Sequence, residues 1–154
     1  MERIYISDYF DLEKIALSGQ CFRVKRFEDE TYRFIKGDRI LYMKQLSEHE
    51  YQVSCGQKEW NEFWEDYFDL PRQYSKICDK TRGENDFIQS AAEYSKGIRV
   101  LHQDPWEMLI TFIISQRKNI PAITKSVEAL SQKYGHNLGH SIQHIRNPIS
   151  QTTV

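Results

Sequence analysis

The sequence has 154 residues, which is enough for one ordinary domain or for a small domain and part of another. Its net charge is −1, so it lacks the strong basic excess typical of a general nucleic-acid binder. The three cysteines form no C-x-x-C pair, which argues against a disulfide framework or a zinc knuckle and favours a reducing cytoplasm.

The first half of the chain predicts a short helix followed by an antiparallel sheet. The helix is expected over residues 11–17, with its apolar residues on one face. Alternating apolar and polar residues then predict strands over residues 21–26, 31–36, 40–44 and 51–55. Gly37-Asp38 is a tight-turn signal between two of them. We therefore expect an antiparallel meander with one covered face.

The pattern then becomes helical. One wide apolar stripe has helical spacing and predicts a helix that faces the core; it consists of Trp60, Phe63, Trp64, Tyr67 and Phe68. A second stripe over residues 87–94 predicts another helix, stopped by Gly97. Strands followed by helices indicate an α+β fold that divides near residues 70–85.

Residues 104–123 are the most informative segment. Asp104 is a good N-cap, Pro105 suits the first helical position, and Met108–Ile114 is apolar nearly all round, which predicts a fully covered helix. Residues 115–119 break the pattern. Asn119 can then cap a second helix that runs to Tyr134.

The bend at residues 115–119, here called the elbow, places amide and guanidinium donors beside a new helix N-terminus. Such donors suit a phosphate or a base edge. A solvated loop between two core helices is the alternative, and the pattern alone favours it. The charge distribution adds one observation: residues 95–154 carry +4 and residues 1–94 carry −5, so the basic excess lies in the half that contains the elbow.

Three ordered blocks over roughly residues 8–135 closely resemble the 8-oxoguanine DNA glycosylases, base-excision enzymes of the helix-hairpin-helix superfamily. The blocks are Ser18-Gly19-Gln20-Cys21-Phe22-Arg23, then Tyr67-Phe68-Asp69-Leu70 with Tyr74, then Gly97-Ile98-Arg99-Val100-Leu101 continuing through Asp104-Pro105-Trp106-Glu107 to Ser115-Gln116 and Asn119-Ile120-Pro121. The resemblance implies an α+β fold, with an N-terminal antiparallel-sheet domain with flanking helices and then an incomplete all-helical domain. The expected divisions are residues 1–80, 81–135 and a tail, 136–154, that lacks the helix-hairpin-helix.

The resemblance also implies residue roles. Gly19, Gln20 and Phe22 would recognise an extruded oxidised purine, with the Gly19 carbonyl accepting the N7 proton that 8-oxoguanine carries and guanine lacks. A left-handed helix cap is the alternative role for Gly19. The orphaned base and the DNA backbone would be held by Gln116, Arg117, Lys118 and Asn119. The family's elbow is typically richer in asparagine, so a strict preference for an opposite cytosine is not implied.

No catalytic residue is expected in this chain. The family's nucleophilic lysine and assisting aspartate lie in or beyond the helix-hairpin-helix, and residues 136–154 stop resembling the family. The expectation is an N-terminal portion, from a truncated gene, a frameshift or a chosen boundary. Lys118, Lys125 or Lys133 as a substitute nucleophile is not favoured, because an active lysine needs burial or cationic neighbours.

No metal or other cofactor is expected. Nucleotide-binding glycine motifs are absent from the sequence. His136, His140 and His144 are spaced like metal ligands on a helix, but Asn137, Gly139 and Pro148 disfavour that helix, so a polar tail is preferred.

The leading hypothesis is base-excision DNA repair by the N-terminal portion of an 8-oxoguanine DNA glycosylase and lyase, catalytically incomplete as given. The alternatives are a non-catalytic module that binds damaged DNA and an interaction domain that does not involve DNA. The expected partner is double-stranded DNA with oxidised guanine, with no membrane partner, because the apolar runs are too short to span a bilayer. Self-association through exposed helical faces along Met108–Ile114 is also expected, as is a bacterial-type cytoplasmic location at the nucleoid.

Overall fold

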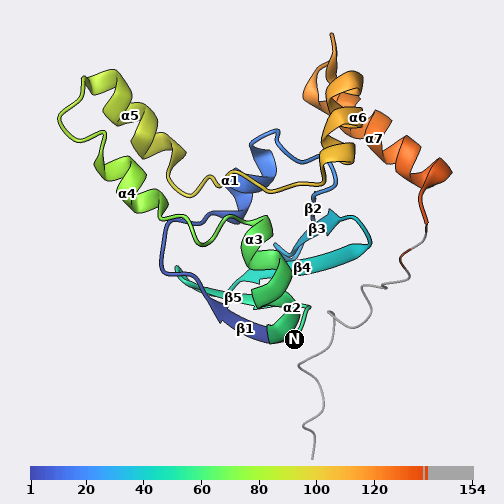
Figure 1. The fold of residues 1–154 in the computed structure, drawn as a ribbon, viewed down its shortest axis with the longest axis horizontal. Coiled ribbons are helices and arrows are strands. Elements are labelled where there is room, and N and C mark those ends of the chain that lie inside the picture. Colours follow the sequence, from blue (N-terminus) through green and yellow to red (C-terminus); the bar gives the residue numbers. More distant parts are fainter. Residues whose placement is uncertain (137, 139–154) are drawn as a thin grey trace, which may run out of the picture.

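The computed structural model describes residues 1–136 and 138. An antiparallel sheet lies at the base of the molecule, in the strand order β1-β5-β4-β3-β2 (Figure 1). The strands are β1 (Glu2–Tyr5), β2 (Lys25–Arg26), β3 (Tyr32–Lys36), β4 (Arg39–Gln45) and β5 (Glu50–Val53). The helices are α1 (Leu12–Leu17), α2 (Gln57–Glu59), the π-helical η1 (Trp60–Trp64), α3 (Glu65–Tyr67), α4 (Tyr74–Asp79), α5 (Asp86–Ser95), α6 (Pro105–Ser115) and α7 (Ile120–Tyr134). The expected α+β class is confirmed.

The sheet follows from the period-two pattern and one tight turn. β3 and β4 pair from Tyr32 opposite Met43 to Lys36 opposite Arg39, so Gly37 and Asp38 form a two-residue loop. Gly37 has a φ of +59°, as the first loop position of a type II′ hairpin turn requires. The sheet's inward face carries residues such as Phe34, Leu41 and Met43, which are fully buried.

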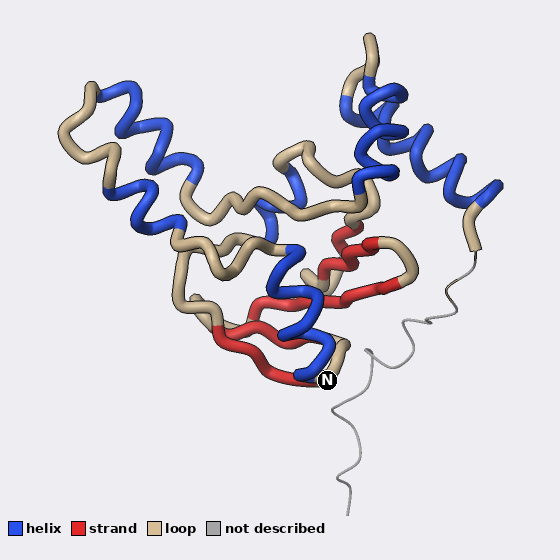
Figure 2. The backbone as a smooth tube through the Cα atoms, viewed as in Figure 1, coloured by secondary structure: helices blue, strands red, loops and turns tan. Residues whose placement is uncertain are grey.

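The aromatic stripe forms the other half of the core, as predicted. The segments α2, η1 and α3 are consecutive and cross the sheet as one helical stretch (Figure 2). Trp60, Trp64, Tyr67 and Phe68 are buried, and Phe68 meets the Phe34 ring edge to face with centroids 5.1 Å apart. Since stacked helix and sheet bury both apolar faces, this core supplies a rigid base for the segments that follow.

Two strand predictions differ from the structure. The predicted strand over residues 21–26 is only Lys25–Arg26, because residues 21–24 form a bend and irregular backbone instead of continuing the sheet. β1 was not predicted, since Glu2–Tyr5 has only Ile4 buried and pairs with β5 at the sheet's edge. Helix α4 was also not predicted.

Two helical hairpins, α4–α5 and α6–α7, project away from the sheet on different sides (Figure 1). The caps of α6 are as predicted, because Asp104 accepts a hydrogen bond from the Glu107 amide at 2.9 Å. The prediction of a fully covered α6 is wrong for this structure: Phe112 is 66% and Ile113 57% exposed. Among the described helices and strands, α7 is the element that packs extensively against α6. The apolar side chains of α6 are therefore only partly covered, in agreement with the expected exposure along Met108–Ile114.

Candidate nucleic-acid interface

Gly19 lies directly after α1 and has a left-handed backbone. Asp11 caps the start of α1 by accepting from the Lys14 amide, and Ser18 ends the helix. Gly19 follows with a φ of +76°, so the helix-capping role weighed for it is present. A Cβ placed on Gly19 would lie 3.6 Å from Cδ1 of Ile120. Gly19 therefore also lies close to the first residue of α7.

The elbow joins α6 to α7 in a tight turn. Arg117 has a φ of +58°, and the Lys118 amide donates to the Ser115 carbonyl at 3.1 Å. Asn119 caps α7 as predicted, accepting from the Ala122 amide at 3.1 Å. The four candidate contact residues, Gln116, Arg117, Lys118 and Asn119, are all exposed. Polar and cationic side chains thus meet solvent beside a helix N-terminus, where an anion is favoured.

The structure brings the two predicted recognition elements together. Gly19 and the elbow are about a hundred residues apart in the chain, yet Ile120 adjoins both. Lys118 leans back along α7, where its Nζ donates to Ser126 Oγ at 3.2 Å. The Gly19 backbone and the elbow therefore belong to one continuous region of the surface.

Gln20 is held by four short hydrogen bonds. Its Nε2 donates to Ser18 Oγ at 3.0 Å and to the Arg99 carbonyl at 2.8 Å, while its Oε1 accepts from the Leu101 amide at 3.0 Å. Its own carbonyl accepts from Nε2 of Gln103 at 2.7 Å. Contact between Gln20 and a base remains a prediction, and the structure shows that its amide already binds the protein.

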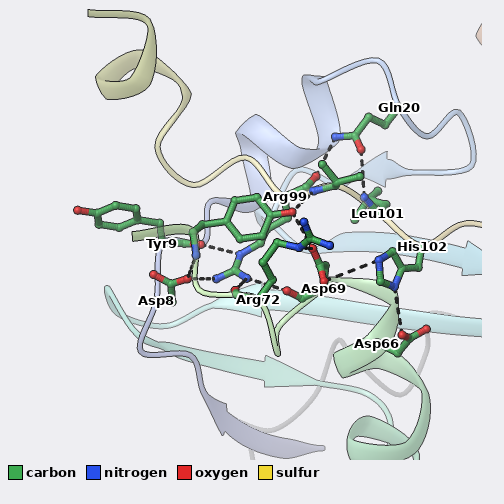
Figure 3. A network of polar contacts seen from close by, with 11 residues as sticks. Asp8, Tyr9, Gln20, Asp66, Asp69, Arg72, Arg99, Leu101 and His102 are labelled. Carbon is green, nitrogen blue, oxygen red and sulfur yellow. Dashed lines mark hydrogen bonds and ion pairs between the residues drawn. The ribbon is translucent and has the colours of Figure 1, made fainter. Parts of the chain in front are cut away.

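Arg99 anchors the strand-like segment that Gln20 binds. Its side chain is fully buried, and its guanidinium donates to carbonyls in two loops and to Asp8, as Figure 3 shows. The distances are 2.8 Å to Tyr9 O, 3.0 Å to Asp69 O, 3.1 Å to Arg72 O and 3.0 Å to Asp8 Oδ2. The Tyr74 ring lies 4.5 Å from the guanidinium carbon. Arg99 thus joins the sheet domain to the start of the helical part.

The Asp8 carboxylate completes this network. It accepts from the backbone amides of Tyr74 at 2.6 Å and Ser75 at 3.0 Å, at the first turn of α4. Burial acts to raise the pKa of Asp8, but hydrogen bonds from Ser75 and Tyr74 outweigh it and leave that pKa below its ordinary value. Burial lowers the pKa of Arg99, and Asp8 opposes that effect. Both groups are therefore held as an ion pair.

Phe22 lies beside a cavity on the α6–α7 hairpin. The cavity has a volume of about 270 Å³, and the segment 21–23, α6 and α7 line it. Arg23 and Glu107 form an ion pair at this boundary. Phe22 is half-buried there, whereas Gly19 lies against Ile120. Phe22 therefore lies beside the middle and end of α7, and Gly19 lies near its start.

The lysines and histidines weighed for chemistry are not gathered into a site. Lys118, Lys125 and Lys133 are exposed, so none has the buried setting of a lysine nucleophile. His136 is exposed, while His140 and His144 lie outside the described residues. Among the described residues, no three His, Cys, Asp or Glu side chains are grouped to hold a metal ion, and none of the helices is both long and apolar enough to cross a membrane.

Residues 3–109 match the family described as 8-oxoguanine DNA glycosylase, N-terminal domain. This match covers well over half of the chain. The chain belongs to that family. The resemblance inferred from the three sequence blocks is thereby confirmed.

Relatives in sequence and in structure agree with this assignment. An N-glycosylase/DNA lyase of Saccharomyces cerevisiae is 40% identical over 57 residues, 34% of this chain and 15% of that protein. The structure of MBOgg1 in complex with a low-affinity DNA ligand has 32% identity and a TM-score of 0.79, covering 87% of this chain and 46% of that one. The Clostridium acetobutylicum 8-oxoguanine glycosylase/lyase, in complex with double-stranded DNA containing cytosine opposite 8-oxoG, has 30% identity and a TM-score of 0.75, covering 86% and 48%. The chain spans about half the length of these structural relatives.

Two residues of the region were not singled out from sequence. Arg99 lies within a quoted family block, but no pattern marked it as fully buried with a carboxylate partner far away in sequence. Gln103 precedes the α6 cap and gives no signal of its bond to the Gln20 carbonyl. Both contacts cross the boundary between sheet and helices, and periodicity within one element does not report such contacts.

Proposed function

We propose that this chain is the lesion-recognising, DNA-binding portion of an 8-oxoguanine DNA glycosylase that acts in base-excision repair. Residues 1–80 would form the sheet domain, 81–135 a partial helical domain and 136–154 an atypical tail. Family membership supports the proposal, as do relatives whose structures hold DNA. Double-stranded DNA with an oxidised guanine is the proposed partner.

The observation that carries the proposal is the closeness of Gly19 to Ile120. It places a side-chain-free backbone segment next to an exposed elbow that carries Arg117 and Lys118. DNA with a base turned out of its stack needs two groups of contacts, one for the extruded base and one for the gap and phosphates. One surface here supplies both.

On the base side, the Gly19 carbonyl would accept the N7 proton of 8-oxoguanine. Guanine presents a lone pair at that atom, so the same carbonyl would face an acceptor and lose its partner. Phe22 would also contact the base, while Gln20, whose carboxamide binds Arg99 and Leu101, would support this side from behind. On the gap side, Arg117 and Asn119 offer donors to an orphaned base, with Gln116 as a further amide and Lys118 near the phosphates.

A titration of the full chain with labelled duplex tests this proposal. Duplexes with 8-oxoguanine or guanine opposite cytosine are compared by fluorescence anisotropy at several salt concentrations. Arg117→Ala is expected to weaken binding about 5- to 10-fold, because it removes a donor to the orphaned base, and Lys118→Ala is expected to reduce the salt slope by about one phosphate contact.

Arg82→Ala is the matched control, because Arg82 is 82% exposed at its side chain and lies in the α4–α5 hairpin. We expect it to change the affinity less than about twofold, since its pair with Asp79 is itself exposed. Equal losses for both variants, or none for Arg117→Ala, would exclude the elbow as the contact.

We assign no catalytic residue to the chain. Borohydride trapping on a lesion duplex is expected to give no covalent adduct, since the described lysines near the elbow are exposed and none is placed as a nucleophile. An adduct formed by this chain alone would overturn that assignment.

We also propose self-association through the open face of α6 and α7. This face exposes large apolar side chains, a feature that marks interaction surfaces; they include Trp106, Met108, Leu109, Phe112, Ile113 and Ile120. Light scattering across a dilution series is expected to show a dimer at high concentration, and a monomer throughout would refute it. A cytoplasmic location at the nucleoid is part of the same proposal, and fluorescence microscopy of a tagged chain tests it.

A further inference from the structure

The Gln20 carboxamide pairs with an extended backbone as another peptide group would. Its Nε2 donates to the Arg99 carbonyl at 2.8 Å and its Oε1 accepts from the Leu101 amide at 3.0 Å. One planar carboxamide thus donates to the carbonyl of Arg99 and accepts from the amide of Leu101, two residues further along the chain. This two-point pairing fixes both the position and the rotation of the carboxamide.

The main chain of Gln20 is fixed to the same segment. Nε2 of Gln103 donates to the Gln20 carbonyl at 2.7 Å. On the other side, the Ser18 hydroxyl donates to the Ile15 carbonyl at 2.7 Å and accepts from Nε2 of Gln20 at 3.0 Å. Gly19 is therefore flanked by two residues whose polar groups are both committed.

This arrangement matters because Gly19 itself is the permissive position. Gly19 has a φ of +76° and no side chain, so its backbone is intrinsically freer than that of any other residue type. A methyl group at Gly19 would meet Cδ1 of Ile120 at 3.6 Å, which is an ordinary van der Waals distance. Apolar contact alone does not set the direction of a carbonyl, whereas hydrogen bonds on both sides do.

The anchoring segment leads directly to the elbow. Arg99 is fully buried and bound to both loops of the sheet domain, and three residues beyond Leu101 the Asp104 cap starts α6. Gln20 binds residues 99–103, and the chain continues from there into α6, the elbow and Ile120. Ile120 in turn lies close to Gly19, the neighbour of Gln20. The hydrogen bonds of Gln20 thus join the Gly19 segment to the segment that leads to the elbow.

We infer that Gln20 is a positioning residue for lesion specificity, fixing the Gly19 carbonyl relative to the elbow through its pairing with Arg99 and Leu101. This inference rests on the proposed function and assigns affinity and lesion specificity to different residues. The phosphate contact proposed for Lys118 in the elbow contributes affinity for any duplex, because phosphate contacts do not distinguish bases. Gln20 sets the preference for 8-oxoguanine over guanine.

The test measures two quantities on the same variants, namely the affinity for a guanine duplex and the ratio of affinities for 8-oxoguanine and guanine duplexes. Gln20→Ala is expected to lower the ratio about tenfold and to change the guanine-duplex affinity less than about twofold. Gln45→Ala, at the exposed end of β4, is the matched control and is expected to leave both quantities unchanged.

A readout on the protein alone identifies the cause. Hydrogen exchange at the Leu101 amide should quicken in Gln20→Ala, since its acceptor is lost. If Gln20→Ala fails to fold, Gln103→Leu replaces it; this variant removes only the bond to the Gln20 carbonyl and should also lower the ratio.

An unchanged ratio in a folded Gln20→Ala, or in Gln103→Leu where the former does not fold, overturns the inference. A ratio of one in the unsubstituted chain is a different result, because it refutes the proposed lesion recognition itself. A loss of guanine-duplex affinity equal to the loss for 8-oxoguanine duplex would also overturn the inference, since Gln20 would then act on binding in general.

Discussion

Replacing Arg99 by methionine tests whether one buried cation joins the sheet to the DNA-facing part. Methionine retains apolar contact with the Tyr74 ring but removes all four hydrogen bonds of the guanidinium. It leaves Asp8 without its cation and three backbone carbonyls without this donor. Removing one partner of a buried ion pair costs about 3–5 kcal/mol, so we expect a loss of that size in the free energy of unfolding.

Urea unfolding followed by tryptophan fluorescence measures this loss, because Trp60 and Trp64 are buried in the core. Arg26→Met is the matched control. Arg26 pairs with Glu13 and Glu30, but its side chain is 49% exposed, so its loss should lower the free energy of unfolding far less than the loss of Arg99. Equal effects of the two substitutions would refute the assignment of Arg99 as the anchor.

Three further predictions concern the same scaffold. Gly97→Ala should destabilise the fold far more than Gly37→Ala, and thermal unfolding of the two variants measures the difference. Both glycines have a positive φ, but a Cβ on Gly97 would lie 2.5 Å from Asp11 Cβ, whereas a Cβ on Gly37 would meet nothing within 4 Å. The lowered pKa of Asp8 contributes stability that is present above its ordinary value of 3.8 and lost as the pH falls through the lower folded value; acid unfolding should show this loss, and Asp8→Asn should abolish it. Burial raises the pKa of Tyr51 to about 12, so its contribution to folding stability is present below pH 10.0 and is lost as the pH rises toward 12. In an absorbance titration, Tyr51→Phe should lack one tyrosine that ionises at high pH. An unchanged titration would contradict the assignment.

Local patterns predicted most of the elements. Asp11, Asp104 and Asn119 each accept the expected capping hydrogen bond, and Gly97 ends α5 with a φ of +92°. These signals depend on residues within one turn, so they are legible in the sequence. Strand Glu2–Tyr5 escaped prediction because it is an edge strand with one buried residue, and its partner β5 lies far along the chain.

The sequence predicted the separate segments of the candidate site, but it did not predict that they lie close together. Resemblance to the family indicated Gly19 and the elbow, and the structure shows that Ile120 joins them. The roles of Arg99, Gln20 and Gln103 depend on contacts across eighty or so residues of chain, which no local pattern reports. The apolar run of α6 predicted a fully covered helix, and this is wrong for the described residues, because burial depends on contacts with other elements that the pattern of one helix does not specify.

The most direct test of the central claim is a map of amide hydrogen exchange with and without a duplex that contains 8-oxoguanine. If one surface holds both the extruded base and the gap, protection should appear together around residues 17–23 and 115–121, and not in α4 or α5. Protection at the elbow without protection around Gly19, or protection confined to the α4–α5 hairpin, would contradict the account.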